Sequence, residues 1–187
     1  MATRDGTWAY RDEHDEFART FFRRFGDGVA SSIGVGTYLG DATDERDAAY
    51  HDAIVTALES GVNVVDTAIN YRHQRSERVV GRALEDADID REAAVVATKG
   101  GFVPFDGERP DDPGAFVKRE YVDTGLVERE ELVMGQHCIA PGFLDDQLDR
   151  SLSNLDVDTI DCYYVHNPET QLAAHSPKEV YERLQAA

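Results

Sequence analysis

Residues 62–71 read VNVVDTAINY, an apolar, strand-like run that ends in an acid, Asp66, and is followed by a phenol, Tyr71. The pattern returns twice further along the chain. Residues 95–101 read VVATKGG and deliver Lys99, and residues 160–166 read IDCYYVH and deliver His166. Nearly continuous apolar runs are typical of strands that are buried on both faces of a parallel sheet. We therefore expect neighbouring parallel strands with reactive side chains at or just beyond their carboxyl ends.

Helical patterns alternate with these strands. A first strand is predicted at 31–38, and apolar residues at helical spacing predict helices over about 44–60, 76–87 and 144–155, with another beginning near Pro177. Four successive βα units indicate an α/β fold with a parallel sheet and helices outside it. The first 30 residues are interpreted as a polar N-terminal segment, and 31–187 as one domain.

Residues 100–143 separate the third strand from its helix. This segment is charged, contains several prolines, and far exceeds the ~2–6 residues of an ordinary βα connection. It follows a strand on the side where the reactive residues gather. Our hypothesis is an insertion that forms a lid or wall beside the substrate, and the alternative is a plain surface insertion.

Two parallel-sheet architectures compete. A doubly wound open sheet carries a glycine-rich phosphate loop after its first strand, but Gly34, Gly36 and Gly40 do not have the GxGxxG spacing. A (β/α)8 barrel of the TIM type draws its active residues from the carboxyl ends of several strands. That arrangement fits Asp66, Lys99 and His166, so we favour the barrel. A barrel needs about 250 residues, so the chain is expected to hold only the first four units, a half barrel.

The chain is strongly acidic. It has 37 Asp plus Glu against 19 Lys plus Arg, a formal net charge of -18. Such a surface repels nucleic acids and anionic membranes, so neither is expected as a partner. Lysine is rare while Asp is abundant, which favours adaptation to high salt over an ordinary acidic protein.

No apolar run approaches the ~18 residues of a membrane span, and residues 1–16 are polar without a signal peptide, so we expect a cytoplasmic protein.

The two cysteines, Cys138 and Cys162, form no CxxC motif, so they suggest neither a redox motif nor a zinc site. Adjacent His137 and Cys138 could hint at a metal, but they lack partners at suitable spacing. No metal site is predicted.

Five stretches resemble the aldo-keto reductase superfamily, in the order in which its members carry them. They are GVGTY at 34–38, DTAINY at 66–71, SERVVGRAL at 76–84, VVATKGG at 95–101 and YYVHNPE at 163–169. The resemblance covers about residues 30–187, the N-terminal half of a family member. It implies a barrel, a preference for NADP(H), and reduction of aldehydes and ketones.

The resemblance also implies site residues. A catalytic set of four, here called the tetrad, maps onto Asp66, Tyr71, Lys99 and His166. Gly36, Thr37 and Tyr38, together with Asp66, match positions near the nicotinamide of the cofactor. The family's cofactor contacts after strands five, seven and eight have no counterpart in this sequence.

The tetrad suits carbonyl reduction. The cofactor carries the hydride, while the protein supplies position and electrostatics. Tyr71 would donate the proton, Lys99 would favour its loss, Asp66 would orient Lys99, and His166 would hydrogen-bond the substrate oxygen. Taken singly, each residue type also has a purely structural explanation. An Asp after a strand can cap a turn or helix, a Lys can be a solvated strand end, and a His in an apolar run can be a core residue. Glu77 also matches a family position, and we interpret it as an acid at a helix N-terminus.

Three functions were therefore weighed. In the first, the chain is half of an oxidoreductase that pairs with a complementary C-terminal half. In the second, it is an inactive fragment or interaction subunit that kept the tetrad by descent. In the third, it is a metal-dependent hydrolase on a similar barrel. The third would need paired histidines on strand ends, which the first strand lacks. We favour the first.

Overall fold

The computed structural model describes residues 1–187 and centres on a four-stranded parallel sheet. The strands are β3 (Val35–Gly36), β4 (Val64–Asp66), β5 (Val95–Gly100) and β6 (Cys162–Val165), and they pair in chain order. β3 pairs only with β4, and β6 only with β5, so both outer strands leave one edge open.

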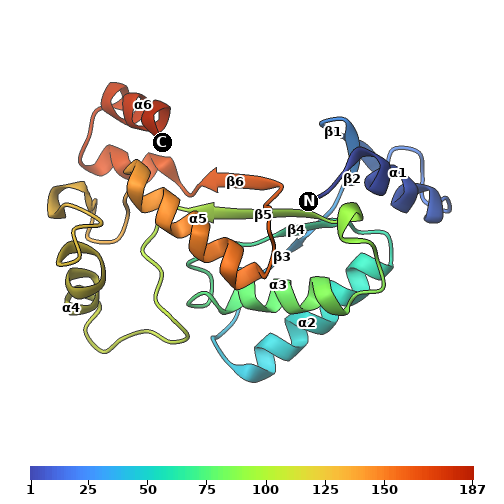
Figure 1. The fold of residues 1–187 in the computed structure, drawn as a ribbon, viewed down its shortest axis with the longest axis horizontal. Coiled ribbons are helices and arrows are strands. Elements are labelled where there is room, and N and C mark those ends of the chain that lie inside the picture. The colour runs from blue at the N-terminus through green and yellow to red at the C-terminus, as the bar shows by residue number, and fades with distance from the viewer.

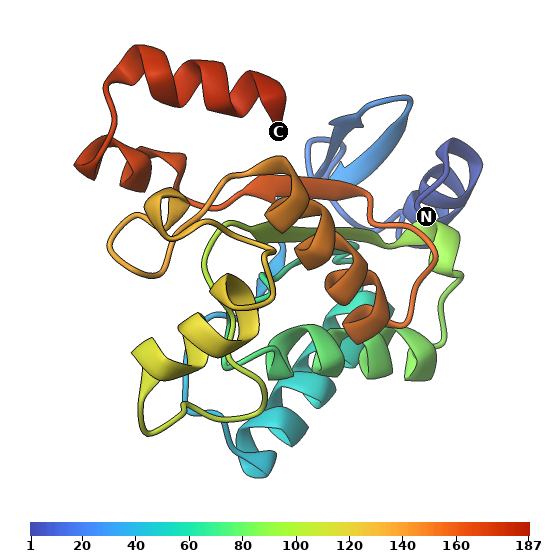
Figure 2. The ribbon, with the colours of Figure 1, turned by 60° about the vertical axis from the view of Figure 1, so that its left-hand side comes forward.

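Helices cover one face of this sheet (Figure 1). They are α2 (Asp44–Glu59), α3 (Arg75–Asp86) and α5 (Pro141–Leu155), each following one strand. The fourth, α6 (Pro177–Ala186), follows β6 but packs against the short 3-10 helix Pro168–Ala173 and stands away from the other three (Figure 2). The alternation of strand and helix is the predicted one.

Alternation along the strands sends one set of side chains to the helices and the other to the second face. Val65 and Val96 are completely buried and pack with Ile54, Val80 and Leu155 from the three helices. Burying such aliphatic side chains contributes about 1.5–3 kcal/mol each. Their strand neighbours point the other way.

The second face of the sheet remains uncovered by helices (Figure 1). Asp66 and Lys99 lie on it near the carboxyl ends of β4 and β5, and Tyr164 of β6 is 49% exposed. The functional candidates thus lie on the open side of the sheet.

Residues 1–30, expected to be a polar segment, are folded. They form α1 (Arg4–Glu13) and an antiparallel hairpin of β1 (Phe22–Phe25) and β2 (Gly28–Ser31). Tyr10, Phe22 and Val29 are buried in a small core of their own. Trp8 of α1 lies at the hairpin, where its indole N–H donates to the Asp27 carbonyl at 3.4 Å.

The expected first strand at 31–38 is wrong in its bounds, because only Val35 and Gly36 pair with β4. Ser31 belongs to β2, and its backbone N–H donates to the Oδ1 of buried Asn63 at 2.8 Å. The Asn63 amide in turn donates to the Ala93 carbonyl at 2.9 Å. This side chain fastens the hairpin to the amino end of the sheet.

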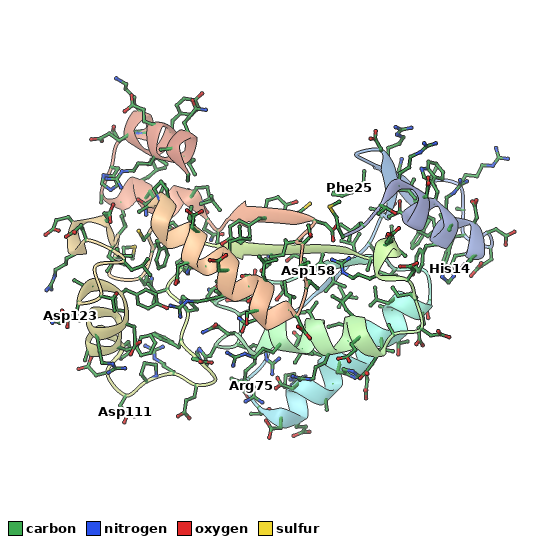
Figure 3. All side chains as sticks on the ribbon, viewed as in Figure 1. His14, Phe25, Arg75, Asp111, Asp123 and Asp158 are labelled. Atoms are coloured by element: carbon green, nitrogen blue, oxygen red, sulfur yellow. The ribbon has the colours of Figure 1, made fainter.

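The long segment 100–143 lies at the opposite end of the molecule. Figure 3 labels Phe25 of the hairpin at one end and Asp123 of the long segment at the other. The segment contains α4 (Pro113–Val117), a π-helical turn (Lys118–Val122) and a 3-10 turn (Arg129–Glu131). It has its own core, formed by Val103, Val117, Tyr121, Val127, Cys138 and Phe143. Burial of Cys138 there raises the pKa of its thiol to about 11.

Two further features complete the fold. Arg75, labelled in Figure 3, begins α3 and pairs with Asp47 of α2 at 2.5 Å, which ties these helices together. None of the helices is both long and apolar enough to cross a membrane.

Candidate active site

Lys99 is the centre of the polar cluster at the carboxyl end of the sheet. Its Nζ donates to Asp66 Oδ1 at 2.6 Å, to the Thr67 carbonyl at 2.7 Å and to the Tyr71 hydroxyl at 3.3 Å. The three donors of the ammonium group are therefore all directed at oxygen atoms. This is a defined orientation for a side chain that is usually mobile.

The backbone explains why Tyr71 reaches Lys99. After β4 the chain stays paired with β5, because Thr67 N–H donates to Ala97 and Ile69 N–H donates to the Lys99 carbonyl, at 2.9 and 3.2 Å. Tyr71 follows two residues after Ile69, and the Lys99 ammonium lies 4.9 Å from the centre of its ring. A short extension of the strand thus presents the phenol to the lysine.

His166 completes the predicted set. Its ring meets the Tyr71 ring edge-on, with centroids 5.5 Å apart, and it contacts Phe102 in the same way at 5.1 Å. Its Nδ1 is buried without a hydrogen-bond partner. The structure therefore brings Asp66, Tyr71, Lys99 and His166 together, from β4, the loop after it, β5 and the end of β6.

The imidazole of His166 is neutral at physiological pH. Burial, the positive charge of Lys99 and the nearby His137 lower its pKa from 6.5 to about 4. A neutral imidazole can donate one hydrogen bond and accept another. It can therefore orient a carbonyl oxygen without carrying a charge of its own.

His137, which sequence reasoning weighed only as a possible metal ligand, holds the His166 backbone in place. Its Nε2–H donates to the His166 carbonyl at 2.7 Å, and its Nδ1 accepts from the Gln171 amide at 2.8 Å. Burial lowers the pKa of His137. Both ring nitrogens are thus engaged, and the long segment is tied to the end of β6. No local sequence pattern indicates these contacts, since they join residues 29 and 34 positions apart.

Glu77 does more in the structure than the expected role of an acid at a helix N-terminus. It is fully buried in α3, and its carboxyl accepts from the Thr98 hydroxyl at 2.6 Å and from the Asn154 amide at 2.9 Å. Burial raises its pKa despite these hydrogen bonds. It joins α3, β5 and α5 on the helix side of the sheet.

The predicted cofactor residues lie beside the tetrad. Gly36 ends β3 opposite Asp66, with open space where a side chain would project. Tyr38 is 66% exposed, and its ring meets that of Tyr71 at 5.0 Å. Thr37 differs, because it is fully buried and its hydroxyl donates to the Thr67 hydroxyl at 2.8 Å. The available surface for a planar ring is thus Gly36, Tyr38 and the half-exposed Asp66.

The sequence from residue 32 to residue 187 matches the signature of the Aldo/keto reductase family. The chain belongs to the aldo/keto reductase family. Among curated relatives, it is 29% identical over 158 residues to an aldo-keto reductase of Alternaria alternata, AMT2, covering 80% of this chain and 42% of that protein. It is also 27% identical over 160 residues to the Bacillus subtilis aldo-keto reductase YhdN, covering 83% of this chain and 40% of that protein.

Solved structures of this family share the fold. The holo form of aldo-keto reductase AKR11C1 from Bacillus halodurans matches with a TM-score of 0.55 at 25% identity, over 86% of this chain and 46% of that one. The glycerol dehydrogenase AKR11B4 of Gluconobacter oxydans matches at 21% identity with a TM-score of 0.58, over 91% of this chain and 53% of that one. The expected barrel-type α/β fold is therefore confirmed, and this chain spans about half the length of both solved proteins.

Proposed function

We propose that this aldo/keto reductase chain provides the proton-donating half of an NADP(H)-dependent enzyme that reduces aldehydes or ketones. One observation carries the proposal: Lys99 Nζ bridges the Asp66 carboxylate at 2.6 Å and the Tyr71 hydroxyl at 3.3 Å. A phenol next to an ammonium held by a carboxylate is suited to give a proton to an oxygen atom, because the ammonium stabilises the negative charge left behind.

Each residue then has one role. Tyr71 donates its hydroxyl proton to the carbonyl oxygen as that oxygen gains negative charge. Lys99 stabilises the resulting phenolate, and Asp66 keeps Lys99 charged and directed. His166, held neutral, hydrogen-bonds the same substrate oxygen and fixes the carbonyl against Tyr71.

The cofactor would supply the hydride that attacks the carbonyl carbon. The residues present fit its nicotinamide end, because Gly36 leaves open space and the exposed Tyr38 ring stands beside Tyr71. Buried Thr37 would act through the backbone, since its hydroxyl is engaged by Thr67. The preference for NADP over NAD rests on the family resemblance.

A complementary C-terminal half is the partner that this function requires. The open edges of β3 and β6 offer unpaired backbone groups to further strands. The open face of the sheet carries the half-exposed Tyr164 where a closed barrel would pack side chains. We infer that the complementary half covers these edges and completes the cofactor site.

The test is complementation. The purified chain is assayed for NADPH oxidation with a panel of aldehydes and ketones, alone and mixed with the C-terminal half of a full-length relative such as the Bacillus halodurans reductase. Turnover is expected in the mixture, and Tyr71→Phe is expected to lower it by ~10²–10⁴-fold because the proton donor is lost. Tyr181→Phe, on exposed α6, is the control and should leave turnover unchanged.

Two results would count against the proposal. Full turnover by the Tyr71→Phe mixture would remove Tyr71 as the proton donor. Stable association of the halves without turnover would favour the second candidate function, an interaction subunit, which the open strand edges also suit.

A further inference from the structure

A cavity of about 330 Å³ lies beside the tetrad, between the loop after β4 and the long segment 100–143. Phe102 connects the cavity to the tetrad, because this residue lines the cavity and its ring contacts His166, with centroids 5.1 Å apart. Asn70, the residue before Tyr71, lines the cavity as well, and its Oδ1 is buried without a hydrogen-bond partner. A molecule with its carbonyl at Tyr71 and His166 would extend into this space.

The charge of the cavity is opposite to that of the molecule. The chain holds 37 Asp plus Glu, yet none of the 12 residues that line the cavity is acidic. Its ionisable side chains are Arg109 and His73. The cavity between α2 and α3, by contrast, mixes both signs, with Asp44, Asp47 and Asp52 beside Arg75, Arg78 and Arg82. A lining that contains an arginine and no acid is a favourable position for an anion, and this one includes Asn70, the residue before Tyr71 of the tetrad.

The backbone holds Arg109 close to the cavity. The turn at residues 72–74 has positive φ angles at three consecutive non-glycine residues, a conformation that needs support from its surroundings. That support comes from the long segment: Gly107 N–H donates to the His73 carbonyl at 2.9 Å, and the Gln74 amide donates to the Phe105 carbonyl at 2.8 Å. Arg109 follows two residues after Gly107.

Arg109 is free to meet a ligand. The carboxylate of nearby Asp106 forms an ion pair with the Arg78 guanidinium, with an N–O distance of 2.7 Å. Asp112 caps α4, because its carboxylate accepts a hydrogen bond from Ala115 N–H at 2.9 Å. Arg109 has no carboxylate partner in the structure. Burial and then the charge of Arg109 lower the pKa of His73, which leaves it a neutral hydrogen-bonding group beside the guanidinium. The remaining walls are apolar, with Phe102, Val103 and Phe105 among them.

We propose that this cavity binds the tail of a carbonyl substrate that carries a carboxylate, with Arg109 as the counter-ion, His73 as a neutral donor and the aromatic walls burying the intervening carbon chain. The inference deepens the proposed reductase function and rests on it. An oxo acid would be preferred over the same ketone without its carboxylate, because planar Arg recognises carboxylates with two parallel hydrogen bonds.

The chain offers its own reporter for binding. Its 2 methionines are Met1 and Met134, and Met134 lines the cavity. With isotope-labelled methionine methyl groups, the NMR signal of Met134 can be followed while the chain is titrated with levulinate, a methyl ketone that ends in a carboxylate. Methyl propyl ketone, which has the same carbon skeleton without the carboxylate, is the matched ligand.

We expect a saturable shift of the Met134 signal with levulinate and a much weaker response to the neutral ketone. Arg109→Gln should weaken levulinate binding by ~tenfold, the loss of one charged hydrogen-bonding partner. Arg23→Gln, an equal charge change on the exposed face of the remote hairpin, should leave binding unchanged.

Equal binding of the two ligands, equal binding by the Arg109→Gln variant, or no saturable shift at all would each overturn the proposal. The readout involves neither cofactor nor turnover. If the proposed reductase function is wrong, NADPH oxidation will be missing while levulinate binding stays intact. If the proposed carboxylate site is wrong, the NMR titration will show no preference for levulinate over methyl propyl ketone.

Discussion

Lys99 acts on two neighbours at once. It donates to the Tyr71 hydroxyl, and its positive charge is one of the causes that hold the pKa of His166 at about 4. Because the folded chain keeps His166 neutral while an unfolded one titrates near 6.5, the unfolded state binds more protons between these values. The contribution of His166 to stability is thus fully present above pH ~6.5 and is lost as the pH falls toward 4.

Lys99→Met should raise the pKa of His166 from about 4 toward its ordinary value, since burial remains but the neighbouring charge is gone. Titration of the His166 ring signals by NMR measures this in the chain by itself. Lys118→Met is the control, because Lys118 pairs with Asp123 in the long segment. An unchanged pKa in Lys99→Met would show that the charge of Lys99 is not felt at the imidazole.

At the residue scale, the sequence indicates the tetrad because each member follows an apolar run, and the carboxyl ends of parallel strands meet at one edge of a sheet. What the sequence does not indicate is how the set is held. His137 holds the His166 carbonyl from 29 positions away, and Gln171 in turn holds the His137 ring from 34 positions away. The catalytic roles remain a prediction that complementation tests.

At the scale of elements, α3 and α5 meet through a glycine. A side chain at Gly81 of α3 would come within 2.5 Å of the Leu155 carbonyl of α5, whereas one at Gly142 of α5 would meet nothing within 4 Å. The close approach lets Leu155 reach the buried core beside Val80. Gly81 therefore sets the distance between these two helices.

Gly81→Ala is expected to lower the free energy of unfolding by about 1–3 kcal/mol, because the helices must move apart. Gly142→Ala should raise it by roughly 0.5–1 kcal/mol, because alanine favours a helix where space allows. Urea unfolding followed by circular dichroism compares the two variants with the parent chain. If both variants gain stability, the contact at Gly81 is not a constraint.

Elements differed in how readily the sequence indicated them. β4, β5 and β6 were expected because their residues are almost continuously apolar. β3 is only Val35–Gly36, and Ser31, expected to begin that strand, pairs in β2 of the hairpin. The β1–β2 hairpin was missed because exposed arginines at 23 and 24 hide its apolar pattern. The sequence signal that could have found it is the Gly26-Asp27 dipeptide between the strands, a two-residue turn in which Gly26 adopts a positive φ of 54°.

At the scale of the whole molecule, the net charge of -18 spreads repulsion over a chain of 187 residues. We propose that the chain is adapted to high salt, where screening shortens the range of this repulsion to about 3 Å at 1 M. The midpoint of thermal unfolding should then rise steadily from low to molar KCl. A midpoint independent of KCl would contradict the adaptation, and glucose at equal osmotic strength controls for effects unrelated to charge.

Trp8 offers a separate view of the chain. It is the single tryptophan, and it lies with Arg11 and Asp27 in the N-terminal unit, at the far end from the tetrad. Its fluorescence therefore reports the cap formed by α1 and the hairpin, while far-ultraviolet circular dichroism reports the helices on the sheet. If the two signals change at the same urea concentration, Asn63 couples cap and sheet into a single cooperative unit. If the fluorescence changes at a lower urea concentration, the cap unfolds as a separate cooperative unit while the sheet and the tetrad remain folded.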